Sequence, residues 1–573
     1  MAAEALPRAK HMAARDPFPL RPPQTVMRLT RLGAFHQSRL SFMRVLLRRL
    51  KREGWRFERP IWRIDAKGVG VATYAAIGPE RTYTLVCFAH DLPPEQRSDR
   101  VIAEAWDATF TLFDGVPSEE DIARLSHNVP KQEAGRIAES ELVLSRANRS
   151  VRMFNYVVDC LARGMQPLES EIEPVGYLMR TTAVYGSGKF GAADRDLWKD
   201  RPEFRGSFQP ELLTVWLIRS FTLDLVEHLA QAHAPETAVT LEPKLRRSFG
   251  VGNSTGLGMA PFLISHPALI HSWIAAREEA LARVRGVTSA EPAQAERFRG
   301  LLARAFSNAE SWRSAHPLQA PKIEALRRDL ARAQQQVAEG GLEGVHPWNA
   351  LYLWAEKNLS LEGQEQLVSL LLEPFPELVD ELAEGMSADE AARFRIDGAM
   401  KLFKLRALLR ENYSWALATD YGTDSEIARV WYVSEEKLEP RLGERFAEPL
   451  DAYEQPLAPG RDAALLVAAL DDWDGKDSVA AFLAAHPEHR HCVRRAQISA
   501  ACPYAEIRDN TIAAEMLPID LLRCKLSFFG ATRFDPRSDR WVRITMYQQA
   551  PFPEELAAAD PDDLAYPPLR SAP

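Results

Sequence analysis

Residues 210–232 read PELLTVWLIRSFTLDLVEHLAQA, and the interpretation of the rest of the chain starts from them. Apolar side chains fall on nearly every face of a helix formed by this stretch, which predicts a helix buried on all sides. The run of residues 177–185 upstream predicts a strand. A buried helix that follows a strand indicates a mixed α+β core.

The flanking sequence predicts further elements of both kinds. A first helix is expected over 35–53, where apolar residues gather on one face against arginines. Helical spacing is expected through 95–164, including 140–162, and through almost all of 267–420. Strands are expected over 60–64, 70–77, 82–89, 427–433 and 541–547, with the turn Gly78-Pro79-Glu80-Arg81 joining a hairpin.

These patterns predict an α+β, predominantly helical fold. We expect a large multi-lobed chain with short antiparallel β hairpins and a central helical block, because 573 residues exceed the roughly 250–300 that one core reaches. The expected regions are a disordered N-terminal arm over 1–25, an α+β region over 26–166, a central region with two Gly-rich loops over 167–288, a helical region over 289–415 and an α+β C-terminal region over 416–573.

Composition excludes several classes of protein. The net charge of -8 argues against a nucleic-acid surface. No apolar run reaches the roughly 18 residues of a membrane span, and residues 1–23 lack the apolar core of a secretory signal. The five cysteines are odd in number and form no C-x-x-C pair, which favours free thiols in the cytoplasm. Abundant alanine and arginine are typical of a GC-rich bacterial genome, and the chain size favours a homodimer.

The strongest local feature is the stretch FGVGNSTGLGMAP at residues 249–261. Glycines permit close backbone approach, and free amides ahead of a helix favour an anion. We predict that the loop 250–258 binds an anionic group through Gly252, Asn253, Ser254, Thr255 and Gly256. It is neither a P-loop nor a dinucleotide fingerprint. The alternative is a tight turn whose glycines serve packing alone.

A second glycine segment, YGSGKFG, occupies residues 185–191 and follows the predicted strand. Ligands of α/β proteins usually bind where a strand ends. Lys189 is therefore a candidate acid–base group, Schiff-base former or charge clamp, with Tyr185 beside it. The alternative is a lysine in a solvent-facing loop.

Two further segments supply candidate binding residues. Tyr421 lies between two acids in SWALATDYGTD (414–424), a pattern that also suits an Asx turn. Arg508 and Asp509 form a polar group in an apolar stretch, where the arginine could clamp a carboxylate or pair structurally with Asp509. The histidines of HPEHRHC (486–492) match no standard zinc spacing, so no metal site is assigned.

Together these residues predict an enzyme that acts on a small organic anion by acid–base chemistry, without a nucleotide cofactor. The substrate would carry a carboxylate, on an aliphatic or aromatic body. Lys189 and Tyr185 would transfer protons, as in a lyase that catalyses a retro-aldol or elimination step. A hydrolase with Ser254 as nucleophile is the second choice. Gly252, Asn253, Thr255, Gly256, Arg508, Asp509 and Tyr421 would bind the substrate.

Two alternatives from other classes stay open. The chain could be a non-enzymatic helical scaffold whose residues 267–415 form a partner surface, or a nucleotide- or flavin-dependent enzyme with an atypical binding loop. The enzymatic hypothesis requires the two glycine segments to fold next to each other, because they lie about 60 residues apart in the chain.

Overall fold

The computed structural model describes most of the chain. The described residues are 18–91, 106–128, 138–181, 201–204, 208–256, 267–314, 317, 319–386, 394–418, 433–434, 437–438, 459–508, 518–531, 533–538 and 541–568.

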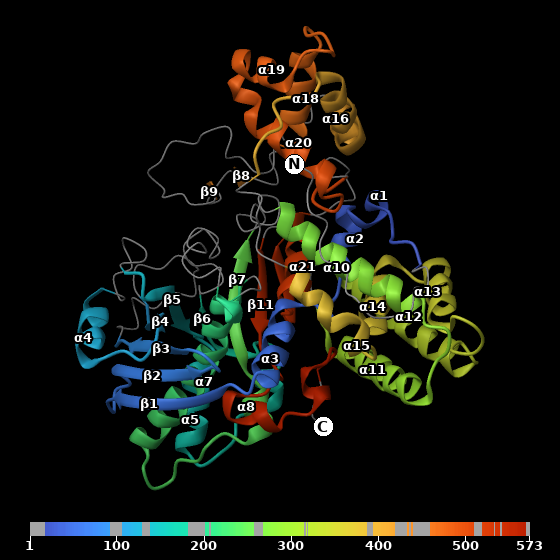
Figure 1. The fold of residues 1–573 in the computed structure, drawn as a ribbon. Coiled ribbons are helices and arrows are strands. Elements are labelled where there is room, and N and C mark those ends of the chain that lie inside the picture. The colour runs from blue at the N-terminus through green and yellow to red at the C-terminus, as the bar shows by residue number, and fades with distance from the viewer. Residues whose placement is uncertain are drawn as a thin grey trace.

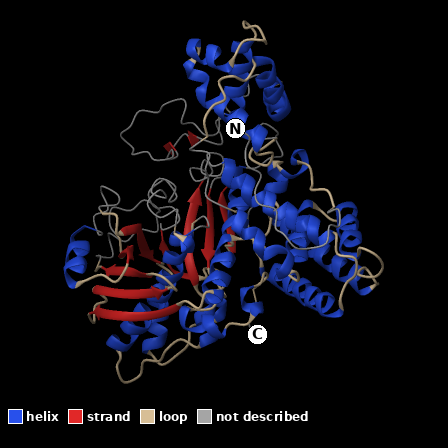
Figure 2. Cartoon of the chain, in the orientation of Figure 1, coloured by secondary structure: helices blue, strands red, loops and turns tan. Residues whose placement is uncertain are grey.

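A nine-stranded sheet forms one side of the molecule (Figures 1 and 2). Neighbouring strands run antiparallel at every step except one, where β6 and β7 run parallel. In spatial order the strands are β1 (Arg56–Ile64), β2 (Gly70–Ile77), β3 (Thr82–Ala89), β4 (Ala108–Asp114), β5 (Glu141–Arg149), β6 (Tyr177–Thr181), β7 (Gly250–Gly256), β11 (Trp541–Met546) and β10 (Arg533–Ser538).

The helix α7 (Gln209–His233) lies against this sheet and is buried along most of its length. It contacts each strand from β2 to β7, so it covers one face of the central sheet. Two of its large polar side chains are hydrogen-bonded inside the protein: Trp216 Nε1 donates to the carbonyl of Pro551 at 2.9 Å, and Arg219 Nε donates to that of Phe249 at 2.7 Å. The prediction of a helix buried on all sides is confirmed.

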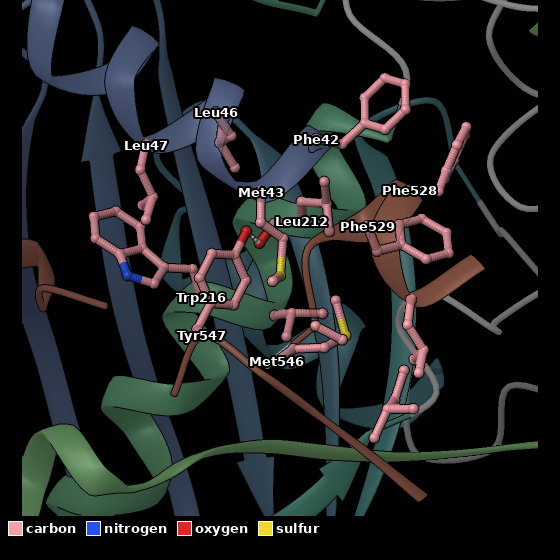
Figure 3. Packing of buried hydrophobic residues seen from close by; sticks show 14 of the residues in the cluster. Phe42, Met43, Leu46, Leu47, Leu212, Trp216, Phe528, Phe529, Met546 and Tyr547 are labelled. Atoms are coloured by element: carbon pink, nitrogen blue, oxygen red, sulfur yellow. Dashed lines mark hydrogen bonds between the residues drawn. The ribbon is translucent and has the colours of Figure 1, made fainter. Parts of the chain in front are cut away.

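A shared apolar core joins α7 to elements from both ends of the chain (Figure 3). Side chains of α3 (Phe42–Arg52) and of α21 (Pro518–Phe529) pack with those of α7 and of the end of β11. Tyr547, which follows β11, donates a hydrogen bond to the carbonyl of Leu212 at 2.9 Å. The N- and C-terminal parts of the chain therefore share one core.

The central helical block packs beside the sheet, and α14 contacts its four other long helices. A smaller group of helices has a hydrophobic core of its own. The block contains α10 (Pro267–Arg285), α11 (Pro292–Ser311), α12 (Ala320–Ala338), α13 (Pro347–Asn358) and α14 (Leu361–Leu372); the smaller core is formed by α16 (Leu402–Leu417), α18 (Pro459–Leu470), α19 (Val479–Ala485) and α20 (Arg490–Ala501).

The remaining elements are short, and the longest of them, α4 and α5, lie on the sheet side of the molecule. They are α1 (Pro23–Val26), α2 (Leu29–Gly33), α4 (Glu119–Asn128), α5 (Phe154–Ala162), α6 (Glu169–Ile172), α8 (Pro243–Ser248), α15 (Pro376–Val379), the 3-10 turns η3 (Pro202–Phe204), η5 (Asp380–Gly385), η8 (Pro487–His489), η9 (Pro553–Ala558) and η10 (Pro561–Leu564), and the hairpin of β8 (Val433–Ser434) and β9 (Lys437–Leu438).

The protein is thus α+β and predominantly helical, as predicted. The expected hairpin is β2–β3, and the expected last strand is β11. The helical prediction for 95–164 is wrong over β4 and β5, because alternating residues such as Thr109, Phe110 and Thr111 serve the two faces of a strand. The predicted region boundaries stay a prediction. The strands of the one large sheet come from several of the predicted regions, between residues 56 and 546. No helix in the described ranges is long and apolar enough to cross a bilayer.

A buried charge network fastens the N-terminal segment to the helical block. Glu365 on α14 is 0 % exposed and accepts hydrogen bonds from Arg21 at 2.6 Å, Arg31 at 2.7 Å and Arg277 at 2.7 Å. Burial alone would raise the pKa of Glu365, but the three guanidinium groups hold it below its usual range. Arg21 lies within the arm expected over 1–25, so residues 18–25 of that arm belong to the packed structure.

We predict that Glu365→Ala lowers the free energy of unfolding by about 3–5 kcal/mol, because it leaves three buried guanidinium groups without their common acceptor. Chemical denaturation measures this change. The matched control is Glu296→Ala on α11, whose side chain is 79 % exposed and which should change stability by less than about 0.5 kcal/mol. Equal effects of the two substitutions would contradict the assigned role of the network.

Candidate functional site

The parallel pair β6–β7 places the strand before the 185–191 segment beside the strand Gly250–Gly256. Arg180 on β6 is the register partner of Gly252 on β7. Residues 182–191 continue from β6, and residues 257 and 258 continue from β7. Because parallel neighbours point their carboxyl ends the same way, β6 and β7 end on the same side of the sheet. Residues 182–191, 257 and 258 lie outside the described residues, so the proximity of the two glycine segments stays a prediction.

The stretch Gly250–Gly256 is a strand and not the predicted loop. It pairs with β11 over Val251 to Gly256 and with β6 at its start, so it does not present a row of free amides to an anion. Gly250 and Gly252 allow neighbouring strands to pack closely against β7. A Cβ on Gly250 would lie 2.3 Å from the carbonyl oxygen of Met546, and one on Gly252 would lie 2.7 Å from Cγ of Arg180 and from the Tyr177 ring.

The face of the sheet opposite α7 carries a group of polar side chains. Phe110 contacts Phe221 of α7, so its neighbour Thr109 points away from α7. Directly opposed residues share a face, and Thr109 pairs with Arg146. Two residues further along β5, Asn148 pairs with Arg180, which in turn pairs with Gly252. We define the polar sheet face as His90, Thr109, Arg146, Asn148 and Arg180.

Burial lowers the pKa of two ionisable groups on the polar sheet face, His90 and Arg146. Desolvation lowers the pKa of His90 against the opposing effect of Asp107, so its imidazole is neutral at neutral pH. The ring Nε2 lies 3.0 Å from Oγ1 of Thr109. Burial also lowers the pKa of Arg146, whose guanidinium lies over the Trp106 ring, 5.3 Å from its centroid. Arg180 is 8 % exposed.

The amide of Asn148 connects this face to the start of β4. Its Oδ1 accepts a hydrogen bond from the backbone N–H of Asp107 at 3.2 Å. Its Nδ2 is buried and has no hydrogen-bond partner among the residues that the structure describes. A buried polar group without a partner is costly, so a ligand acceptor at this position would stabilise the site. Two guanidinium groups, an amide donor and a neutral imidazole together suit a carboxylate that undergoes proton transfer.

The residues predicted from the sequence are distributed differently. Lys189, Tyr185, Tyr421 and Asp509 lie outside the described residues. The backbone positions of Ser254, Thr255 and Gly256 are in β7, beyond Gly252. Asn253 is buried and, by strand alternation, points to the face opposite Gly252.

Arg508 lies among other elements. Its backbone N–H donates to the carbonyl of Met27 at 2.8 Å, and its Nη1 donates to that of Glu411 at 3.3 Å. Within the described residues, no hydrogen bond or ion pair joins Arg508 to β6 or β7. Across those same residues, no group of His, Cys, Asp and Glu side chains could hold a metal ion.

His90, Arg146, Asn148 and Arg180 were missed in the sequence. The signal that could have found two of them is the stretch LVLSRANRS at 142–150, where polar residues alternate along β5. Helical spacing through 140–162 was preferred instead, and that choice placed Arg146 and Asn148 on different faces. Asn148 and Arg180 are neighbours because β5 pairs with β6, and this pairing is not visible in the sequence.

Comparisons with known proteins give no relative. No protein-family model matches the chain, and neither a curated protein nor a solved structure is significantly similar to it.

We predict that Gly252→Ala destabilises the protein by about 1–3 kcal/mol, because the new methyl group would overlap Arg180 and Tyr177. Thermal or chemical unfolding measures the effect. Gly300→Ala on α11 is the matched control, because a Cβ there meets nothing within 4 Å and should stabilise the helix by about 0.5–1 kcal/mol. A neutral Gly252→Ala variant would contradict the close approach of β6 to β7.

Proposed function

We propose that the protein is an enzyme that binds a small organic carboxylate on the polar sheet face and converts it by acid–base chemistry without a nucleotide cofactor. The observation that carries this proposal is the placement of Arg146, Asn148 and Arg180 on one face of adjacent strands, with His90 on the same face. The opposite face is closed by α7, so a ligand of the central sheet has one face left to use.

Charge and hydrogen bonding favour a carboxylate as the bound group. Two guanidinium groups in a partly desolvated site attract an anion more strongly than in water, and a planar carboxylate accepts their paired N–H donors. The Nδ2 donor of Asn148 supplies a further hydrogen bond between the two arginines. Gly252 lies opposite Arg180 on β7, and its missing side chain lets the Arg180 side chain and the Tyr177 ring pack against this strand.

The proposed chemistry is an elimination or retro-aldol step of the lyase type. Lys189 and Tyr185 follow Arg180 by nine and five residues in the chain, and we assign them proton transfer. His90 is neutral at neutral pH and supplies a further proton acceptor. In an elimination, one of these bases takes the proton next to the carboxylate, the bond to the leaving group breaks, and a protonated group donates to the departing atom.

Chain composition indicates the setting of the enzyme. Free thiols, including the buried Cys87, Cys492 and Cys524, suit a reducing cytoplasm. We propose a cytoplasmic homodimer of bacterial type that acts on a small molecule and uses neither nucleic acid nor membrane as partner.

We predict that a small carboxylate from a ligand panel raises the melting temperature of the protein and that Arg180→Gln weakens its binding about tenfold or more. Isothermal titration measures the affinity. Arg299→Gln, with a side chain that is 50 % exposed on α11, is the matched control and should bind like the wild type. If no carboxylate binds, or if a folded Arg180→Gln variant binds unchanged, the site is wrong and a helical scaffold becomes the better account.

We further predict that Lys189→Ala reduces turnover of the bound carboxylate by at least about a hundredfold while its affinity changes little, because general acid–base groups contribute about 10²–10⁴-fold to rate. Turnover and binding are measured on the same variant. Lys67→Ala, at an exposed position before β2, is the control. Full activity of Lys189→Ala would remove Lys189 from the mechanism and leave His90 as the candidate base.

A further inference from the structure

Two neighbouring chain segments expose apolar side chains among acidic ones. The first segment, residues 159–173, runs from the last turn of α5 past α6, and the second, residues 235–244, follows α7. Met165 and Leu168 of the first segment are 50 % and 63 % exposed, and Val239 of the second is 37 % exposed. We call the two segments together the acidic apolar surface.

Hydrogen bonds hold the two segments against each other. The backbone N–H of Val239 donates to the carbonyl of Leu161 at 3.1 Å. The side-chain amide of Gln166 bonds to the second segment twice: its Nε2 donates to the carbonyl of Thr240 at 2.8 Å, and its Oε1 accepts from the backbone N–H of Glu242 at 3.1 Å. Because both segments are already fixed in place, covering their side chains would cost little further ordering of the chain.

The acidic apolar surface carries a large share of the negative charge of the protein. Its 25 residues contain six carboxylates and two cations, which accounts for half of the net charge of -8. One of the cations, Lys244, already pairs with Glu169 at 2.8 Å. The acidic residues, all of them exposed, are Asp159, Glu169, Glu171, Glu173, Glu236 and Glu242.

This charge decides which partners suit the exposed apolar side chains. Apolar groups rimmed by polar residues mark sites of interaction. A concentration of carboxylates repels nucleic acid and anionic lipid, and it equally repels the same surface of a second copy of the chain. A segment that carries both apolar and basic side chains has the complementary charge.

We propose that the acidic apolar surface docks a basic, amphipathic segment of a partner protein. Met165, Leu168 and Val239 contact the apolar residues of that segment, and the surrounding carboxylates attract its lysines and arginines, which speeds association and fixes its orientation. Three apolar side chains form a small contact, as in transient complexes. The inference does not depend on the carboxylate site, because α5 packs on α7, which covers the other face of the sheet.

Fluorescence anisotropy with a labelled helical peptide of leucine and lysine residues tests the proposal. We expect the wild-type protein to bind this peptide, and to bind neither a peptide with glutamate in place of lysine nor one with serine in place of leucine. Leu168→Ser should weaken binding about tenfold, because the contact of one leucine side chain is lost. Val345→Ser, at a more exposed apolar position before α13, is the matched control and should bind like the wild type.

A charge reversal measures the electrostatic contribution. Glu171→Lys should weaken binding of the leucine–lysine peptide about threefold or more at low salt, and the difference should vanish in about 1 M salt, which screens charges beyond about 3 Å. Glu296→Lys, at an exposed position of α11, is the matched control and should bind like the wild type.

Four results would overturn the proposal. The wild-type protein does not bind the leucine–lysine peptide, or it binds the glutamate peptide equally well. A folded Leu168→Ser or Glu171→Lys variant binds the leucine–lysine peptide as tightly as the wild type. Sedimentation shows a dimer of this chain that Leu168→Ser dissociates, which would assign the surface to a second copy.

Discussion

The packing of α7 against one face of the sheet is the constraint on which the rest of the structure depends. Parallel neighbours need a crossover connection, and α7 lies within the one between β6 and β7. Because α7 is apolar on almost all sides, it must be covered by the sheet beneath it and by α3, α21 and the residues after β11 around it. The polar sheet face lies on the other side of these strands.

Buried ion pairs join α14 to the N-terminal segment, to α10 and to α21. Along α14, Glu362 and Glu365 face inward and receive arginines from the N-terminal segment, α10 and α21. At the end of the same helix, Glu373 meets the arginines of α3. Glu365 accepts from three guanidinium groups, whereas both carboxylate oxygens of Glu373 are buried without a hydrogen-bond partner among the described residues.

The sequence predicts elements that have a clear local pattern. It does not predict features that depend on the pairing of one strand with another. Continuous apolar residues identified α7, and the turn at 78–81 identified the β2–β3 hairpin. The glycine pattern predicts a loop where β7 lies, because Gly250 and Gly252 are required by the backbone and side chains of other strands, which no local pattern reveals. Arg180 and Asn148 become a site only through the pairing of β5 with β6. Lys189 and Tyr185 remain predictions from the sequence alone.

A crystal structure of the protein with its preferred small carboxylate tests the central claim most directly. Ligand density should lie on the sheet face away from α7, with the carboxylate between the guanidinium groups of Arg146 and Arg180. Density on the α7 side of the sheet, or among the helices α16 to α20, would contradict the account.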